Sequence, residues 1–238
     1  YRTECICINL DYFMQVHVGN PSPDAKNKGR NTPMKLYYTP GACSLSPHIA
    51  LLEAGLPYDL VKVDLRAKKL ENGDDFLQVN PKGQVPALAL DTGEMVTEGP
   101  IIIQMIADRA TDKKLAPARD SNERYKLLEW LNYITTELHK NLGPMFSPVL
   151  ADDAKAFFKD RAMGKFKYVE SQLAGHDYLM GNQFTVADGY LFTMIMWAQD
   201  RLGFDLSGLP NLMAYKARVA ARPKVQEALK KEGLLKAA

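Results

Sequence analysis

Cysteine is scarce in this 238-residue sequence, and neither sign of charge dominates it. The three cysteines, at positions 5, 7 and 43, are too few for a disulfide framework, so we expect a reducing compartment, the cytoplasm. With 30 Lys and Arg against 28 Asp and Glu, the net charge of +2 gives no case for a nucleic-acid partner. The longest nearly apolar stretch, 190–198, falls short of the ~20 residues that cross a bilayer, so no membrane partner is expected.

Residues 1–33 differ in composition from the rest of the chain. The run from Asn20 to Pro33 is polar and rich in turn-forming residues, and an ordered pattern begins at Met34. We therefore expect residues 1–33 to be an extension outside the fold, a leader or a remnant of cloning. A metal site made of its two cysteines and His17 would lack a fourth ligand, so no metal is expected.

Strand and helix signals alternate in residues 34–114. The first helix ends at Gly55, and Asp91-Thr-Gly93 is typical of a hairpin between the last two strands. The predicted order is strand, helix, strand, short helix, strand, strand and helix, a βαβαββα unit with a mixed sheet. The expected strands and the last helix are 35–38, 58–63, 85–90, 94–97 and 100–109.

Only helix signals follow in residues 119–238, so the fold class is α/β plus all-α, in two domains. Thr185-Val-Ala-Asp188 is a capping box that opens a helix. Gly189 stands in the fourth position of that helix, where an apolar side chain would pack against Phe184 before the cap. We therefore expect it to weaken the start of the helix. Pro210 and Pro223 lie where helix first turns would begin.

Cys43 is the most informative single residue. It follows a Pro-Gly turn at a strand end and precedes a helix, where backbone N–H groups and the helix dipole favour a thiolate and lower the thiol's pKa. Ser44 or Ser46 could cap this helix. The run Cys43-Ser-Leu-Ser46 is also a CxxC redox motif without its second thiol. The alternative is a small buried cysteine that only packs.

Two later segments suit a ligand that carries both charges. Pro86 opens a strand, where it fits an edge or a special turn, such as one with a cis peptide bond. Glu98 and the N–H of Gly99 stand at a helix start and could hold a zwitterion, with the carboxylate on an ammonium and the N–H on a carboxylate. Alternatively, Glu98 is a plain first-turn acid.

Together these segments resemble the bacterial beta-class cytosolic glutathione S-transferases. The likeness runs from about Met34 to Leu235 and implies a thioredoxin-like N-terminal domain, an all-helical C-terminal domain, a homodimer and glutathione as cosubstrate. It rests on five segments in order: 37–48 (YYTPGACSLSPH), 80–88 (NPKGQVPAL), 97–100 (TEGP), 129–140 (EWLNYITTELHK) and 184–188 (FTVAD).

The resemblance also implies roles for single residues. Cys43 would lie beside the glutathione sulfur and form a mixed disulfide with it, and His139 would donate a hydrogen bond near the thiol. His139 has the alternative of a half-buried interface histidine, and His48 is expected to be structural. The residues implied for glutathione binding are Cys43, Ser44, Lys68, Val85, Pro86, Glu98, Gly99, Asn132, Thr136 and His139.

Each end of glutathione has its own implied partners in this set. Glu98 and Gly99 would hold the γ-glutamyl end, although many relatives carry Ser in place of Gly99. Lys68 would reach the glycine carboxylate, and the backbone of Val85 would pair with the cysteinyl part. Asn132 would act across the dimer interface.

Three functions remain open from the sequence. The first is conjugation of glutathione to small hydrophobic electrophiles. The second uses Cys43 as a nucleophile in glutathione-dependent thiol-disulfide transfer or in reductive dehalogenation. The third is a non-enzymatic protein that binds hydrophobic ligands in the dimer cleft.

Overall fold

The computed structural model describes residues 33–235. The expected extension 1–33, apart from Pro33, and the segment with Cys5, Cys7 and His17 lie outside the described residues. None of the described helices is long and apolar enough to cross a membrane. The described residues also contain no cluster of three or more His, Cys, Asp or Glu side chains that could hold a metal ion.

A mixed five-stranded sheet forms the first half of the described chain, as predicted. Its order is β3-β2-β1-β4-β5, with β1 and β2 parallel and the other neighbours antiparallel. The two-residue β3 was not predicted, because two residues carry no recognisable pattern. The strands are β1 (Met34–Tyr38), β2 (Tyr58–Asp64), β3 (Lys69–Leu70), β4 (Ala87–Ala89) and β5 (Met95–Thr97).

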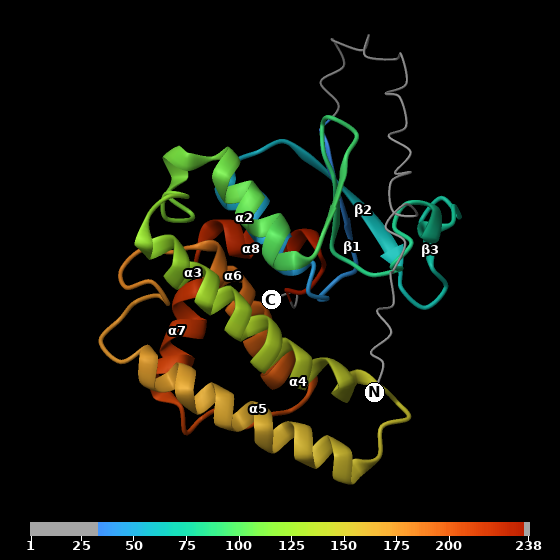
Figure 1. The fold of residues 1–238 in the computed structure, drawn as a ribbon. Coiled ribbons are helices and arrows are strands. Elements are labelled where there is room, and N and C mark those ends of the chain that lie inside the picture. Colours follow the sequence, from blue (N-terminus) through green and yellow to red (C-terminus); the bar gives the residue numbers. More distant parts are fainter. Residues whose placement is uncertain (1–32, 236–238) are drawn as a thin grey trace, which may run out of the picture. The chain divides into compact units, whose positions relative to one another are not determined.

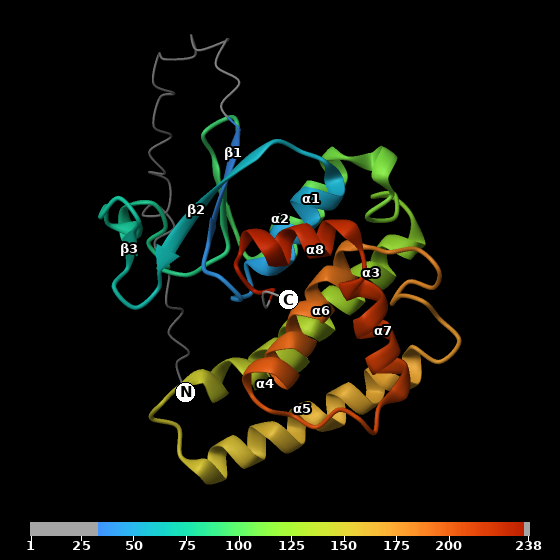
Figure 2. The same ribbon diagram turned by 180° about the vertical axis from the view of Figure 1, so that it is seen from behind.

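Helix α1 (Leu45–Ala54) connects the two halves of the fold. All of its residues except Glu53 are buried, because α2 (Gly99–Arg109) lies on one side of it and α6 (Val186–Met196) and α8 (Pro223–Lys231) pack on others. Figures 1 and 2 show α1, α2 and α8 together on one side of the sheet. The first turn of α1 therefore lies where the sheet half meets the helical half.

The second half of the described chain is helical, as predicted. Figure 1 shows α3 and α4 as one long run beside α6 and above α5. The helices that start at Pro210 and Pro223 confirm the two proline signals. A short helix, η2 (Phe76–Gln78), lies in the sheet half between β3 and β4. The elements after α2 are η3 (Thr111–Lys113), α3 (Asn122–Tyr133), η4 (Ile134–His139), α4 (Lys140–Leu142), η5 (Gly143–Phe146), α5 (Asp152–Gln172), α6, η6 (Trp197–Arg201), α7 (Pro210–Ala220) and α8.

The predicted capping box at the start of α6 is confirmed, and its acidic residue, Asp188, also accepts hydrogen bonds from outside the cap. Asp188 is fully buried, and its Oδ2 accepts hydrogen bonds from the backbone N–H of Thr185 at 2.7 Å and from the Thr185 hydroxyl at 3.0 Å. Its Oδ1 accepts from the N–H of Leu179 and from the hydroxyl of Tyr215, both at 2.9 Å. Asp188 therefore ties α6 to α7 and to the loop before α6.

Gly189 has a packing reason that the sequence did not show. A Cβ atom at this position would lie 3.3 Å from Cγ2 of Ile49 in α1, which is tighter than normal contact. Glycine therefore lets α6 approach α1 closely. The sequence interpretation of Gly189 as a weak helix start missed this contact, because the approach of two helices far apart in the chain leaves no local signal.

Candidate functional site

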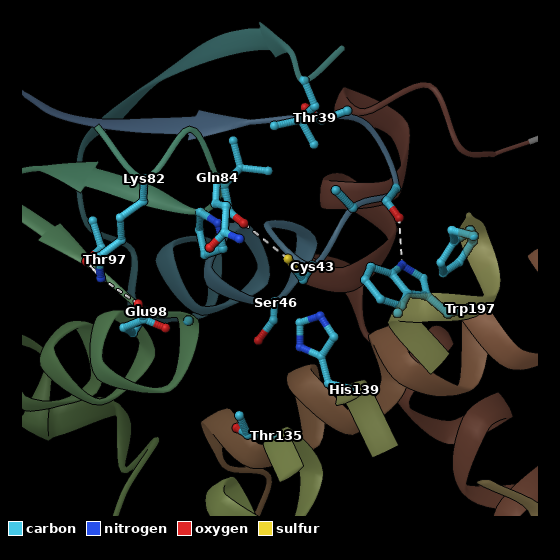
Figure 3. Close-up of a pocket in the computed structure, with 18 of the residues that line it drawn as sticks. Thr39, Cys43, Ser46, Lys82, Gln84, Thr97, Glu98, Thr135, His139 and Trp197 are labelled. Carbon is cyan, nitrogen blue, oxygen red and sulfur yellow. Dashed lines mark hydrogen bonds and ion pairs between the residues drawn. The ribbon is translucent and has the colours of Figure 1, made fainter. Parts of the chain in front are cut away.

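A cavity of about 630 Å³ lies between the sheet half and the helical half. On the sheet side it is bordered by the turn before α1, by the segment before β4 and by the start of α2; η4, η5, α6 and η6 close it from the other side (Figure 3). Of the predicted site residues, seven line it: Cys43, Lys68, Val85, Pro86, Glu98, Gly99 and His139.

Cys43 lies in the turn immediately before α1, and its side chain is half-buried. Its Sγ donates a hydrogen bond to the backbone carbonyl of Val85 at 3.2 Å. Burial, the largest effect, and the charge of Glu98 raise the pKa of the Cys43 thiol, whereas the N–H groups of Cys43 and Ser44 lower it, and the net result is a rise from 9.0 to about 11. The expectation of a thiolate is therefore wrong for this structure, since burial outweighs the helix N-terminus.

Ser44 holds the turn rather than facing the cavity. Its hydroxyl is fully buried, accepts from the N–H of Thr39 at 3.2 Å and donates to the carbonyl of the same residue at 3.3 Å. Ser46, the last residue of the CxxS run, does line the cavity. Its hydroxyl is buried and has no hydrogen-bond partner among the described residues.

The turn before Cys43 is also fixed by the C-terminal part of the chain. The N–H of Gly41 donates to Oε2 of the buried Glu232 at 2.9 Å, and its carbonyl accepts from the indole N–H of Trp197 at 2.8 Å. The other Glu232 oxygen lies 2.8 Å from Nδ1 of His48, which is itself fully buried. His48 therefore has the structural position that was expected for it.

The segment before β4 brings two predicted residues to the cavity wall. The peptide bond between Val85 and Pro86 is cis, and both residues line the cavity directly beside Cys43. A Cβ atom added to Gly99 would meet only Cγ of Pro86, at 3.7 Å, which is ordinary contact. The wall therefore has room for a Cβ atom at position 99.

Charged side chains gather at the open end of this wall. Glu98 has a φ of 69° and pairs with Nζ of Lys82 at 2.6 Å, and both side chains are more than half exposed. Lys68 donates through its Nζ to the carbonyl of Gly83 at 2.7 Å. Lys82 was not among the predicted site residues, although it lies within the NPKGQVPAL segment that carried part of the resemblance.

His139 faces the cavity from the helical half. Its Nδ1 lies 2.7 Å from the hydroxyl of Tyr190, and its ring is 5.0 Å from that of Trp197, nearly perpendicular to it. Burial, and to a lesser extent the charge of Lys140, lower the pKa of His139 to about 4. The ring is therefore neutral at pH 7, and it carries one N–H that it can donate.

Asn132 and Thr136 do not line the cavity of this chain. Both are exposed, and the Thr136 hydroxyl donates to the carbonyl of Asn132 at 3.0 Å. Residues 134–139 form a π-helix, whose wider turn rotates the following side chains relative to an α-helix, and Thr135 lines the cavity instead. A contact of Asn132 across a dimer interface stays a prediction.

Comparison with known proteins connects this geometry to one family. Residues 41–109 match the family "Glutathione S-transferase, N-terminal domain", and residues 136–232 match "Glutathione S-transferase, C-terminal domain". The chain is 49% identical to glutathione S-transferase GstA of Escherichia coli O157:H7 over 201 residues, which covers 84% of this chain and all of that protein.

Two solved structures are similar to the same extent. A ternary complex of BphK, a bacterial GST, is 50% identical, with a TM-score of 0.82 over 84% of this chain and all of that one. A sphingomonad glutathione S-transferase complexed with glutathione is 47% identical, with a TM-score of 0.81 and the same coverage. In the second of these proteins, the ligand is the tripeptide that the sequence resemblance implied.

Proposed function

The chain belongs to the glutathione S-transferase family and is a glutathione transferase, and we propose that it conjugates glutathione to small hydrophobic electrophiles in the cavity beside Cys43. The observation that carries this proposal is the two-sided lining of that cavity. Most of the polar groups lie on the sheet side, whereas the aromatic rings all face the cavity from the helical side. One side suits a peptide and the other an apolar electrophile.

Glutathione would lie along the sheet side of the cavity. The carboxylate of Glu98 and the N–H of Gly99 would hold its γ-glutamyl end, and Glu98 would exchange its contact with Lys82 for the ammonium group. Lys68 would face the glycine carboxylate. The backbone of Val85 would pair with the cysteinyl part, which directs the sulfur towards Cys43.

In the proposed reaction, the glutathione thiol loses its proton to solvent and the thiolate attacks the electrophilic carbon. A carbon–sulfur bond forms, and the leaving group departs as an anion with the bonding electrons. Neutral His139 donates its ring N–H to the thiolate, provided that Tyr190 donates its hydroxyl proton to Nδ1. Such a hydrogen bond to a charged sulfur favours the ionised form.

We propose the domains and the assembly on the same basis. Residues 34–114 form the glutathione-binding domain, and residues 119–238 supply the electrophile site and the dimer contacts. A homodimer would bring Asn132 of one subunit towards the site of the other, since this residue does not reach the cavity of its own chain.

A second candidate reaction is thiol transfer through Cys43, because its sulfur lies in the cavity wall. Attack by Cys43 on a glutathione mixed disulfide would form a new disulfide and release the other thiol. A second glutathione would then have to reduce it, because no cysteine stands at position 46. Reductive dehalogenation would use the same thiol. The raised pKa of Cys43 disfavours, at neutral pH, the thiolate that both reactions need.

Parallel assays separate the two reactions. Conjugation is measured with 1-chloro-2,4-dinitrobenzene and thiol transfer with a glutathione mixed disulfide, on wild type, Cys43→Ala and His139→Gln. We expect Cys43→Ala to lose thiol transfer and keep most conjugation, and His139→Gln to lose conjugation by ~10-fold or more. Absence of conjugation in the wild type, or its loss in Cys43→Ala with His139→Gln unaffected, would contradict the proposal.

A further inference from the structure

The helical side of the cavity carries two cations beside its aromatic rings. Lys140 begins α4, directly after His139, and Arg201 ends η6, which begins with Trp197. Both cations line the cavity, as does Phe146 from η5. The electrophile half is therefore not purely apolar.

Neither cation is neutralised by the part of the chain that the structure describes. Lys140 and Arg201 form no ion pair and no side-chain hydrogen bond within residues 33–235. The one carboxylate among the lining residues is that of Glu98, which belongs to the opposite wall and is already paired with Lys82. An anion that enters the helical half thus meets unopposed positive charge.

Two further observations show that these charges act on the cavity itself. The charge of Lys140 lowers the pKa of the neighbouring His139, so its field reaches the ring that faces Cys43. A guanidinium nitrogen of Arg201 lies 3.0 Å from the position that a Cβ atom on Gly41 would take. Arg201 therefore lies against the turn that carries Cys43.

The Phe146 and Trp197 rings on this side of the cavity form a surface for another ring. Phe146 and Trp197 pack edge to face, with centroids 4.9 Å apart and planes at 78°, and 41% of Phe146 remains exposed. An aromatic ligand can extend such a cluster by offset or edge-to-face stacking. Phe146, Trp197 and the two cations together match a flat ring that carries an acidic group.

We propose that the preferred electrophiles of this enzyme are aromatic acids, with the ring on Phe146 and Trp197 and the carboxylate between Lys140 and Arg201. The inference rests on the proposed conjugation and adds its substrate class. Because both cations are exposed, each contributes only modestly to the preference, and added salt weakens it by shortening the Debye length from its ~8–10 Å at physiological ionic strength. Because both cations would attract the same carboxylate, their two modest contributions add up.

A matched pair of substrates tests the preference. We choose 4-chloro-3,5-dinitrobenzoate and its neutral amide, 4-chloro-3,5-dinitrobenzamide, which share ring, leaving group and size. The readout is the ratio of kcat/KM for the acid to that for the amide, at saturating glutathione, so any effect on glutathione binding cancels. The variants are Lys140→Met, Arg201→Met and the double variant, with Lys230→Met on α8 as control, since this exposed lysine does not line the cavity.

We expect each single variant to lower the ratio by ~3-fold and the double variant by ~10-fold, while the control keeps the wild-type ratio. The wild-type ratio should also fall as NaCl rises to ~0.5 M. A ratio that is unchanged in the double variant overturns the inference. If the enzyme conjugates 1-chloro-2,4-dinitrobenzene but not 4-chloro-3,5-dinitrobenzoate, the inference is also overturned, while the proposed function stands. If it conjugates none of the three compounds, the proposed function itself is overturned.

Discussion

The ionisation of Cys43 decides which chemistry it can perform, so its pH dependence is the sharpest test of this structure. Two effects oppose each other at this thiol. Its own N–H and that of Ser44 favour the thiolate, while burial and the charge of Glu98 disfavour it, and the pKa rises from 9.0 to about 11. At pH 7, ~1 in 10,000 molecules would then carry the thiolate, against ~1 in 100 for a free cysteine.

The same shift contributes to folding stability, and its sign is fixed. The folded state holds the Cys43 proton more tightly than the unfolded state, so the stabilisation is fully present below pH 9. It is lost as the pH rises from 9 towards 11. A shift of two units corresponds to ~3 kcal/mol at most. Cys43→Ala removes this dependence.

Two assays measure these effects. The rate of iodoacetamide alkylation, read on the peptide that contains Cys43 by mass spectrometry, should rise ~10-fold per pH unit up to about pH 10. Urea unfolding at pH 7.5 and pH 10.5 should show a larger loss of stability in wild type than in Cys43→Ala. The argument that burial dominates would be refuted if alkylation were half-maximal below pH 8 and if wild type and Cys43→Ala lost the same amount of stability at pH 10.5.

Three further perturbations test single contacts. Asp188→Ala should lower the free energy of unfolding by ~3 kcal/mol or more, because this buried carboxylate accepts four hydrogen bonds. Thr185→Val should lower it by only ~1 kcal/mol. Equal losses for the two variants in urea titrations would contradict this. Glu98→Gln should weaken glutathione binding about fivefold in calorimetry, a modest effect because the side chain is exposed; unchanged affinity would leave Glu98 as a helix-start acid. Gly189→Ala should destabilise by ~1–2 kcal/mol, because the added Cβ must displace Cγ2 of Ile49; a stabilised Gly189→Ala protein would show that α1 yields at this contact without cost.

Features with a local signal could be predicted from the sequence. The hairpin follows from Asp91-Thr-Gly93, and the start of α6 follows from a cap and an acid three residues apart. The turn before Cys43 follows from Pro40 and Gly41, since only a few residue types suit such a turn. In each case, the residues that determine the conformation are neighbours in the chain.

Features that depend on distant partners could not be predicted in this way. The burial of α1 on nearly all sides requires α6 and α8, which lie far along the chain. Residues 134–139 form a π-helix in which Thr135 rather than Thr136 lines the cavity, and no residue in that run signals the change to i→i+5 hydrogen bonds. Glu232 shows the same limit, because its bond to Gly41 joins residues from opposite ends of the fold.

Cys43 combines both kinds of feature, and this explains why its position was predicted correctly while its ionisation was not. The helix start is local, but the cavity that surrounds the thiol is closed by His139, Tyr190 and Trp197, each of which lies about a hundred residues or more away. With Cys43 held as a thiol at neutral pH, the nucleophile that remains is the sulfur of glutathione itself. That sulfur needs a hydrogen-bond donor, and the neutral ring of His139 can supply one. The desolvation that disfavours the Cys43 thiolate therefore favours conjugation over thiol transfer in the same cavity.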